Sequence, residues 1–190
     1  MSAEFCVPPA RPRLFYVIGP SGAGKDSLLA YARPRVAGRP LAFAHRYITR
    51  PASAGGENHV ALSEAEFAAR ALAGCFALTW NSHGLLYGIG CEVEDWLQHG
   101  LSVVVNGSRE HLPQAASRFP AMVPILVSVH QDELRRRLEA RGRETAEGIA
   151  ERLRRASAFP VHHPALVQLD NSGPLEQAGE QLVRLLRGEI

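Results

Sequence analysis

A glycine-rich segment near the start of the chain contains the residue types and spacing that chemistry on phosphate groups requires. Residues 19–25, Gly-Pro-Ser-Gly-Ala-Gly-Lys, match the pattern G-x-x-x-x-G-K between an apolar run at 14–18 and a stretch with helical character. Glycines let successive backbone N–H groups point at phosphate oxygens, and the N-terminus of the following helix adds partial positive charge. The segment is therefore predicted to bind nucleotide phosphates through these residues: Gly19, Pro20, Ser21, Gly22, Ala23, Gly24, Lys25, Asp26 and Ser27.

Lys25 is the only lysine in a chain that has twenty arginines. A compact, mobile ammonium suits the β- and γ-phosphates of a nucleotide, where a planar guanidinium fits poorly. Lys25 is therefore expected to act in catalysis. The alternative is a glycine-rich turn that joins a strand to a helix and binds no ligand.

The position after Lys25 departs from the usual pattern. A Ser or Thr normally stands there and holds Mg²⁺ through its hydroxyl, but here Asp26 comes first and Ser27 follows. A carboxylate is also a hard oxygen ligand for Mg²⁺. The apolar run at 101–105 ends in Asn106 instead of the Asp that many such enzymes use, and Asp26 would fill that gap. Alternatively, Asp26 only favours the helix N-terminus and Ser27 holds the metal.

A second cationic region lies between residues 135 and 155, which carry eight of the twenty arginines. Arg137 and Arg141 are four residues apart and share one helix face, and Gly142 breaks the helix after them. Such a segment could be a mobile flap whose arginines stabilise a transferring phosphate. The alternative is a solvated helical hairpin with surface ion pairs.

The order of elements predicts the class of fold. Strands are expected at 14–18, 41–49, 76–80, 85–87, 101–105, 123–129 and 166–169. Helices are expected at 25–36, 63–72, 92–99, 108–119, 132–141, 145–159 and 174–187. This alternation indicates an α/β domain with a mainly parallel sheet. The denser, shorter strands of 41–90 suggest a small lobe set into that core.

Composition excludes several classes of protein. The 190 residues include 46% hydrophobic and 21% charged side chains, as in ordinary globular domains, and no apolar run approaches the roughly 18 residues of a membrane span. A net charge of +2 does not favour nucleic acid as the partner. The three cysteines have no disulfide or zinc spacing, so a cytoplasmic location is expected.

The motifs together resemble the guanylate-kinase branch of the nucleoside-monophosphate-kinase-like fold, over roughly residues 14–159. The resemblance rests on residues 19–25, Arg46, Thr49-Arg50-Pro51, Gly56-Glu57, Tyr87-Gly88, Arg137-Leu138, Arg141-Gly142, Ile149, Arg152 and Ala156. It implies a single P-loop domain of three layers, with a core at about 14–40 and 91–190, an acceptor-binding lobe at about 41–90 and an arginine-rich lid at about 137–152. It also implies ATP and Mg²⁺.

The same resemblance assigns roles to individual side chains. It implies that Arg46, Arg50 and Tyr87 hold the phosphate of the acceptor, with Glu57 in the same acceptor site. It further implies that three later arginines act in catalysis at the transferring phosphate; these are Arg137, Arg141 and Arg152.

Departures from the guanylate-kinase pattern narrow the match. The loop after Glu57 is about four residues shorter and lacks a tyrosine, which removes the expected basis for guanine recognition. With residues 24–27, 45–50, 57–59 and 105–109, the chain is similar to the ribose 1,5-bisphosphate phosphokinases. That family implies ATP-dependent formation of 5-phospho-α-D-ribose 1-diphosphate, in the breakdown of phosphonates in a bacterial cytoplasm, with a small-molecule substrate and without a protein partner.

A phosphate acceptor is already largely dianionic at pH 7 and needs no general base. Catalysis would therefore depend more on cations that offset the repulsion between the two polyanionic reactants than on a general base.

The second substrate phosphate and the ribose hydroxyls have four candidate partners: Arg109, His45, His59 and Asn106. For each of these residues, a purely structural role is at least as good an interpretation. Trp80 is expected in the core. The alternatives are a guanylate kinase and, remotely, a non-catalytic module of the same fold, which would be expected to lose Lys25.

Overall fold

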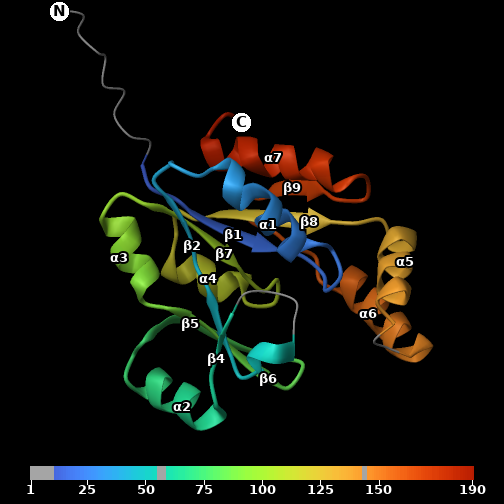
Figure 1. Ribbon diagram of the computed structural model, residues 1–190, viewed down its shortest axis with the longest axis horizontal. Helices are drawn as coiled ribbons and strands as arrows, with labels where there is room; N and C mark the ends of the chain where they lie inside the picture. Colours follow the sequence, from blue (N-terminus) through green and yellow to red (C-terminus); the bar gives the residue numbers. More distant parts are fainter. Residues whose placement is uncertain (1–10, 55–58, 143–144) are drawn as a thin grey trace, which may run out of the picture.

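The computed structural model describes residues 11–54, 59–142 and 145–190. In these parts the chain forms two β-sheets, with helices on both faces of the larger one (Figure 1). The larger sheet is parallel and has the strand order β2-β7-β1-β8-β9, and the smaller has the order β4-β3-β6-β5. The strands are β1 (Leu14–Ile18), β2 (Leu41–Phe43), β3 (Arg46–Ile48), β4 (Val60–Ala61), β5 (Phe76–Ser82), β6 (Leu85–Gly90), β7 (Ser102–Asn106), β8 (Val123–Ser128) and β9 (Val167–Asp170).

Seven α-helices alternate with these strands in the described residues, which confirms the predicted α/β class. They are α1 (Lys25–Arg35), α2 (Glu64–Leu72), α3 (Glu92–Gln98), α4 (Leu112–Arg118), α5 (Gln131–Arg141), α6 (Ala146–Ala158) and α7 (Leu175–Arg187), and a 3₁₀ turn, η1, spans Ala52–Ala54. The capping signals in the sequence are satisfied locally. The hydroxyl of Ser63, for example, accepts a hydrogen bond of 3.1 Å from the backbone N–H of Glu66 at the start of α2.

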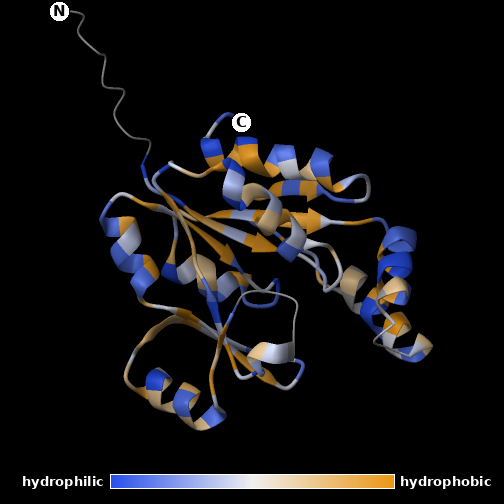
Figure 2. Cartoon of the chain, in the orientation of Figure 1, coloured by the Kyte–Doolittle hydropathy of each residue, from blue (hydrophilic) through white to orange (hydrophobic). Residues whose placement is uncertain are grey.

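Strand β1 lies at the centre of the core because all five of its side chains are apolar and buried. Its side chains alternate between two layers. Phe15 and Val17 pack against α1 and α7 on one face of the sheet, while Tyr16 and Ile18 pack on the other face with α3, α4 and the smaller sheet. Figure 2 shows this pattern, with hydrophobic strands inside and hydrophilic helix surfaces outside. The domain therefore has three layers.

The single strand expected over residues 41–49 is wrong. The chain instead forms β2, which pairs with β7 in the larger sheet, and β3, which pairs with β4 and β6 in the smaller sheet. The two strands are separated by Ala44 and His45, where the chain passes from one sheet to the other. A pattern of apolar side chains shows that a segment is extended, but it does not show which neighbour the strand will join.

The helix expected over 108–119 is shorter than predicted, because α4 begins only at Leu112. The residues before it form a loop held by Tyr16. Its hydroxyl accepts a hydrogen bond of 3.1 Å from the backbone N–H of Ser108, and burial raises the pKa of Tyr16 to about 12. A Cβ atom on Gly107 would lie 2.2 Å from the Tyr16 ring, so only glycine fits there. The loop is thus fixed at the end of β7.

Helices α5 and α6 form a hairpin beside the larger sheet (Figure 1). It has its own small core of buried side chains, Leu134, Leu138, Ile149 and Leu153. Helix α5 ends at Gly142, whose φ of 58° is in the left-handed region that glycine adopts readily. In the described part of the chain, no helix combines the length and apolar character needed to cross a membrane.

Candidate active site

The phosphate-binding loop lies between the end of β1 and the start of α1, as predicted. Two of its glycines, Gly22 and Gly24, have φ values of 93° and 87°, which are unfavourable for residues with a side chain. A Cβ on Gly24 would also lie 2.5 Å from the side-chain nitrogen of Asn171, and one on Gly22 would lie 2.8 Å from Leu134. The loop is therefore shaped by its glycines and packed closely from behind.

Lys25 starts α1 and extends across this loop. Its ammonium donates hydrogen bonds to the backbone oxygens of Gly19, at 2.9 Å, and Pro20, at 3.1 Å. The charge is therefore held at the edge of the loop, where backbone N–H groups and the N-terminus of α1 already favour anions. This placement agrees with the role that the sequence predicts for Lys25.

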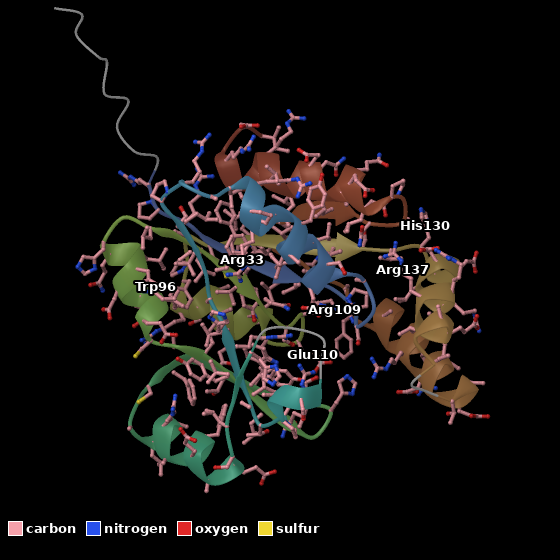
Figure 3. All side chains as sticks on the ribbon, in the orientation of Figure 1. Arg33, Trp96, Arg109, Glu110, His130 and Arg137 are labelled. Atoms are coloured by element: carbon pink, nitrogen blue, oxygen red, sulfur yellow. The ribbon has the colours of Figure 1, made fainter. Side chains whose placement is uncertain are left out.

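A cleft of about 480 Å³ joins the phosphate-binding loop to the smaller sheet. The lining residues are Gly19, Ser21, Gly22, Gly24, Lys25, Asp26, Ser27, Arg46, Arg50, Trp80, Ser82, His83, Leu85, Tyr87, Gly107, Ser108, Arg109, Glu110 and Arg152. Five of these side chains are cationic and two are carboxylic acids, so the cleft suits a highly anionic ligand. Figure 3 labels Arg109 and Glu110 in the region between the two sheets.

The smaller sheet contributes a set of stacked side chains to the cleft. The rings of Trp80 on β5 and Tyr87 on β6 stack with centroids 5.3 Å apart and planes 4° apart. The guanidinium of Arg46 lies over the Tyr87 ring, 5.3 Å from its centre. Because Arg46 and Tyr87 lie on paired strands, the antiparallel register brings them together. Trp80 is buried, as expected, yet it also lines the cleft.

Arg50 follows β3 and is held by His59. The Nη2 group of Arg50 donates to Nδ1 of His59 at 3.3 Å, and Nε2 of the same imidazole donates to the backbone oxygen of Arg50 at 3.1 Å. A guanidinium can only donate and a carbonyl can only accept, so this pair of bonds requires the tautomer with the proton on Nε2. His59 does not line the cleft; it orients Arg50, which does.

Arg152 connects α6 to the phosphate-binding loop. Its Nη1 group donates to the hydroxyl of Ser21 at 2.5 Å, across 131 positions of sequence. Helix α6 therefore brings one cation to the loop where phosphates are expected.

Arg137 lies beside the phosphate-binding loop, with its Nη1 atom 3.7 Å from the position that a Cβ on Gly24 would take. Its Nε group donates to Glu133 at 2.7 Å, and its Nη2 group donates to the backbone oxygen of Asn171 at 2.8 Å. Asn171 in turn donates through its side chain to the backbone oxygen of Ala23 at 2.7 Å. Arg137 is therefore part of a support behind the loop and does not line the cleft; Figure 3 labels it beside α5.

Arg109 lines the cleft from the loop after β7. Its Nη1 group donates to the backbone oxygen of Ala156 on α6 at 2.8 Å, and its guanidinium lies 5.9 Å from the centre of the Phe159 ring. Burial lowers the pKa of Arg109, although the carboxylate of Glu110 acts in the opposite direction. A cation that is partly removed from water binds an anion more strongly. Its placement is compatible with contact to a substrate phosphate.

The remaining candidates have mixed placements. Asn106 is buried at the end of β7 and donates to Asp26 at 2.7 Å instead of lining the cleft, and Ala23 is buried beneath the loop. Glu57 and the side chain of Arg141 lie outside the described residues. The cleft also includes residues that the sequence interpretation did not propose, among them Ser82, His83 and Glu110. The strands expected at 76–80 and 85–87 leave a short connection between them, but nothing in the local sequence shows that this connection faces the phosphate-binding loop.

The chemistry of the donors at the cleft fits a divalent metal that arrives with a nucleotide. Asp26 and Ser27 offer a carboxylate and a hydroxyl beside Lys25. In the ranges that the structure describes, no three His, Cys, Asp or Glu side chains gather as a metal site. Mg²⁺ at nucleotide phosphates does not need such a cluster, because it keeps several waters and binds one or two protein oxygens together with phosphate oxygens.

Similar curated proteins include three that are named ribose 1,5-bisphosphate phosphokinase PhnN. They come from Laribacter hongkongensis, Desulfomicrobium baculatum and Thiobacillus denitrificans and are 60%, 57% and 56% identical over 92% of this chain. The match covers 94% of the Desulfomicrobium protein and 92% of the Thiobacillus protein. It covers only 42% of the Laribacter protein, so this chain spans less than half of that relative. No family model matches the chain.

Solved structures with a similar fold include two kinases. A guanylate kinase from Anaplasma phagocytophilum superposes with a TM-score of 0.68 and 18% identity, over 95% of this chain and 87% of the other. A sugar kinase from Janibacter sp. HTCC2649 superposes with a TM-score of 0.53 and 19% identity, over 93% of this chain and 95% of the other. The three-layer domain therefore has the P-loop fold of a guanylate kinase, as the sequence predicts.

Proposed function

This chain belongs to the ribose 1,5-bisphosphate phosphokinase family, and we propose that it transfers the γ-phosphoryl group of ATP to ribose 1,5-bisphosphate. An oxygen of the phosphate on carbon 1 attacks the γ-phosphorus, and the bond from that phosphorus to the β–γ bridging oxygen breaks. The products are ADP and 5-phospho-α-D-ribose 1-diphosphate. The reaction moves one phosphoryl group and leaves the sugar ring unchanged.

The observation that supports this proposal most directly is that two cationic regions line the same cleft. Lys25, Asp26 and Arg152 gather at the phosphate-binding loop, while Arg46 and Arg50 approach from the smaller sheet. A nucleotide on the loop and a phosphorylated acceptor on the sheet would therefore meet in one place. Holding both reactants in this way converts an encounter of two polyanions into a step within one complex.

The side chains of the cleft fit a phosphate acceptor better than a hydroxyl acceptor. A hydroxyl usually needs a carboxylate to take its proton, whereas a phosphate monoester is already largely dianionic at pH 7. The chief difficulty is electrostatic repulsion. Lys25 and the four arginines that line the cleft would offset this repulsion between the two anionic reactants.

Within this proposal, Asp26 and Ser27 would hold Mg²⁺. When bound, the metal neutralises charge on the phosphate oxygens and orients them. Lys25 would contact the β- and γ-phosphates from the loop, and Arg152 and Arg141 would approach the transferring group from the lid at about 137–152. Arg46, Arg50 and Tyr87 would bind the phosphate that accepts the group, while Arg109 would contact the second phosphate. The enzyme would act as a single domain in the cytoplasm.

Incubation with MgATP and either ribose 1,5-bisphosphate or GMP, followed by ³¹P NMR, tests the proposed reaction. The expected result with the sugar is a new pair of coupled pyrophosphate resonances together with ADP, and slow turnover or none with GMP. Formation of GDP without a product from the sugar would overturn the proposal in favour of a guanylate kinase. A Lys25→Ala sample serves as the blank for a contaminating kinase.

A further inference from the structure

The carboxylate at the phosphate-binding loop is held by a residue 80 positions away. The side-chain nitrogen of Asn106, at the end of β7, donates a hydrogen bond of 2.7 Å to Oδ1 of Asp26. Asn106 is only 6% exposed, while Asp26 is exposed and lines the cleft. The bond joins the buried end of a core strand to the first turn of α1.

The orientation of the Asn106 amide is fixed by this contact. Its Oδ1 atom is buried, and in the described part of the chain it has no hydrogen-bond partner. A rotated amide would place that oxygen against the Asp26 carboxylate, so two acceptors would face each other. The amide therefore satisfies Asp26 although its own oxygen remains unsatisfied, which indicates that the bond to Asp26 is the interaction for which the side chain is placed.

In the Asp26–Asn106 pair, the carboxylate and the neutral polar group have exchanged their usual positions on the loop and the strand end. In many phosphate-loop enzymes, the loop supplies a hydroxyl and the neighbouring strand end supplies an Asp. Here the loop supplies the carboxylate and the strand end supplies a neutral amide. The site keeps one negative charge, but the charge now stands on the exposed loop. With Oδ1 engaged by Asn106, the other carboxylate oxygen is available to a ligand in the cleft.

We propose that Asn106 is a positioning residue for Asp26, whose carboxylate would bind the divalent metal that accompanies the nucleotide. The two residues together would take the place of the loop hydroxyl and strand-end carboxylate that usually bind this metal. This inference rests on the proposed use of a nucleotide and deepens it, but it does not depend on which acceptor is phosphorylated. Asn106 consequently acts through Asp26, and it does not contact the sugar as the sequence alone suggests.

The positioning role of Asn106 can be tested by measuring metal affinity, without relying on enzyme activity. In the complex with ADP, Mn²⁺ binding is followed by electron paramagnetic resonance of the free ion. Because loss of a partner behind a metal ligand typically costs 10- to 100-fold in affinity, Asn106→Leu is expected to weaken Mn²⁺ binding by about tenfold or more. Binding of ADP in EDTA is expected to change less than twofold. The matched control is Asn81→Leu at an exposed position of β5, which is expected to change neither value.

A double-mutant cycle identifies the path of the effect. Asp26→Asn alters only the exposed partner and is expected to weaken Mn²⁺ binding at least as much as Asn106→Leu. Adding Asn106→Leu to Asp26→Asn is expected to change little further, because Asn106 acts through the carboxylate. The exchange D26S/N106D, which restores the usual distribution of groups, is expected to recover affinity to within about threefold of the original chain.

Two outcomes would overturn the inference. One is unchanged Mn²⁺ affinity in Asn106→Leu or, if that variant does not fold, in Asp26→Asn. The other is full additivity in the cycle, which would mean that Asn106 acts independently of Asp26. If the Mn²⁺ results are as expected but the protein phosphorylates only GMP, the inference about Asp26 and Asn106 stands and the proposed acceptor is wrong.

Discussion

The two halves of the cleft are built in different ways. The half proposed to bind the nucleotide is mainly one continuous segment, residues 19–27, shaped by glycines and charged by Lys25 and Asp26, with Arg152 added from α6. The acceptor half draws on β3, β5, β6 and the loop after β7, and its cations are arginines held by neighbouring aromatic and histidine side chains. The first half is specified by local sequence, whereas the second depends on how strands pair.

This difference predicts how each half responds to substitution. A change in the loop should affect phosphoryl transfer with little effect on folding, because Ser21, Asp26 and Ser27 are exposed and are not part of the hydrophobic core. A change in the acceptor half should alter acceptor binding and stability together, because the same side chains pack the smaller sheet.

The largest expected effect tests the nucleotide half. Lys25→Ala should lower kcat by about 10³-fold or more, since a preorganised cation at the transferring phosphate is lost. The melting temperature should stay close to that of the original chain. Steady-state assays and calorimetric melting measure the two quantities, with Arg135→Ala at an exposed position of α5 as the control for loss of a cation. Near-normal kcat would remove Lys25 from the mechanism.

The next test separates the two halves. Arg50→Gln should lower kcat/KM for the acceptor by about 10²-fold, because a charge-assisted contact to phosphate is worth about 1.5–3 kcal/mol. The KM for ATP should change less than twofold. Arg118→Ala, which removes an exposed arginine of α4, provides the matched control. An equal change in both KM values would show that the halves do not act separately.

A third test concerns the coupling of packing and binding in the acceptor half. Trp80→Ala should destabilise the fold by about 3 kcal/mol, because a buried aromatic side chain is lost from the stack with Tyr87. The acceptor KM should rise by about tenfold as Tyr87 and Arg46 lose their support. Trp80→Phe should retain most of both properties. Chemical denaturation and acceptor titration measure them, and a stable variant with weak acceptor binding would contradict the predicted coupling.

The smallest effect tests the support behind the loop. Hydrogen bonds from Arg136 and Arg137 lower the pKa of Glu133 to about 2, from an ordinary value of 4.5. Because the folded state has the lower pKa, this stabilisation is complete above about pH 4.5 and is lost as the pH falls toward 2. The melting temperature of Glu133→Gln should therefore lie slightly below that of the original chain at pH 7, and the difference should shrink below pH 4.5 and vanish only near pH 2. A constant difference across this range would assign the effect to packing.

Sequence reasoning predicted the fold well wherever the signal was local. The five buried apolar residues of β1 and the glycines that follow them each act within a few residues of themselves. It failed at 41–49, where one apolar pattern covers two strands of different sheets. It also missed Ser82 and His83, which approach the loop only when the two sheets come together, and Glu110, which follows β7 of the larger sheet.

The phosphate-binding loop, the order of strands and helices, and the family resemblance can all be recognised in the sequence, because they depend on residues close together along the chain. The contacts of Asn106 with Asp26, of His59 with Arg50, and of Arg137 with Asn171 become visible only in the folded chain. Those contacts join residues that are 80, 9 and 34 positions apart, across separate strands, loops and helices. Side chains identify the groups that can form such bonds, but strand pairing and helix packing decide which groups meet.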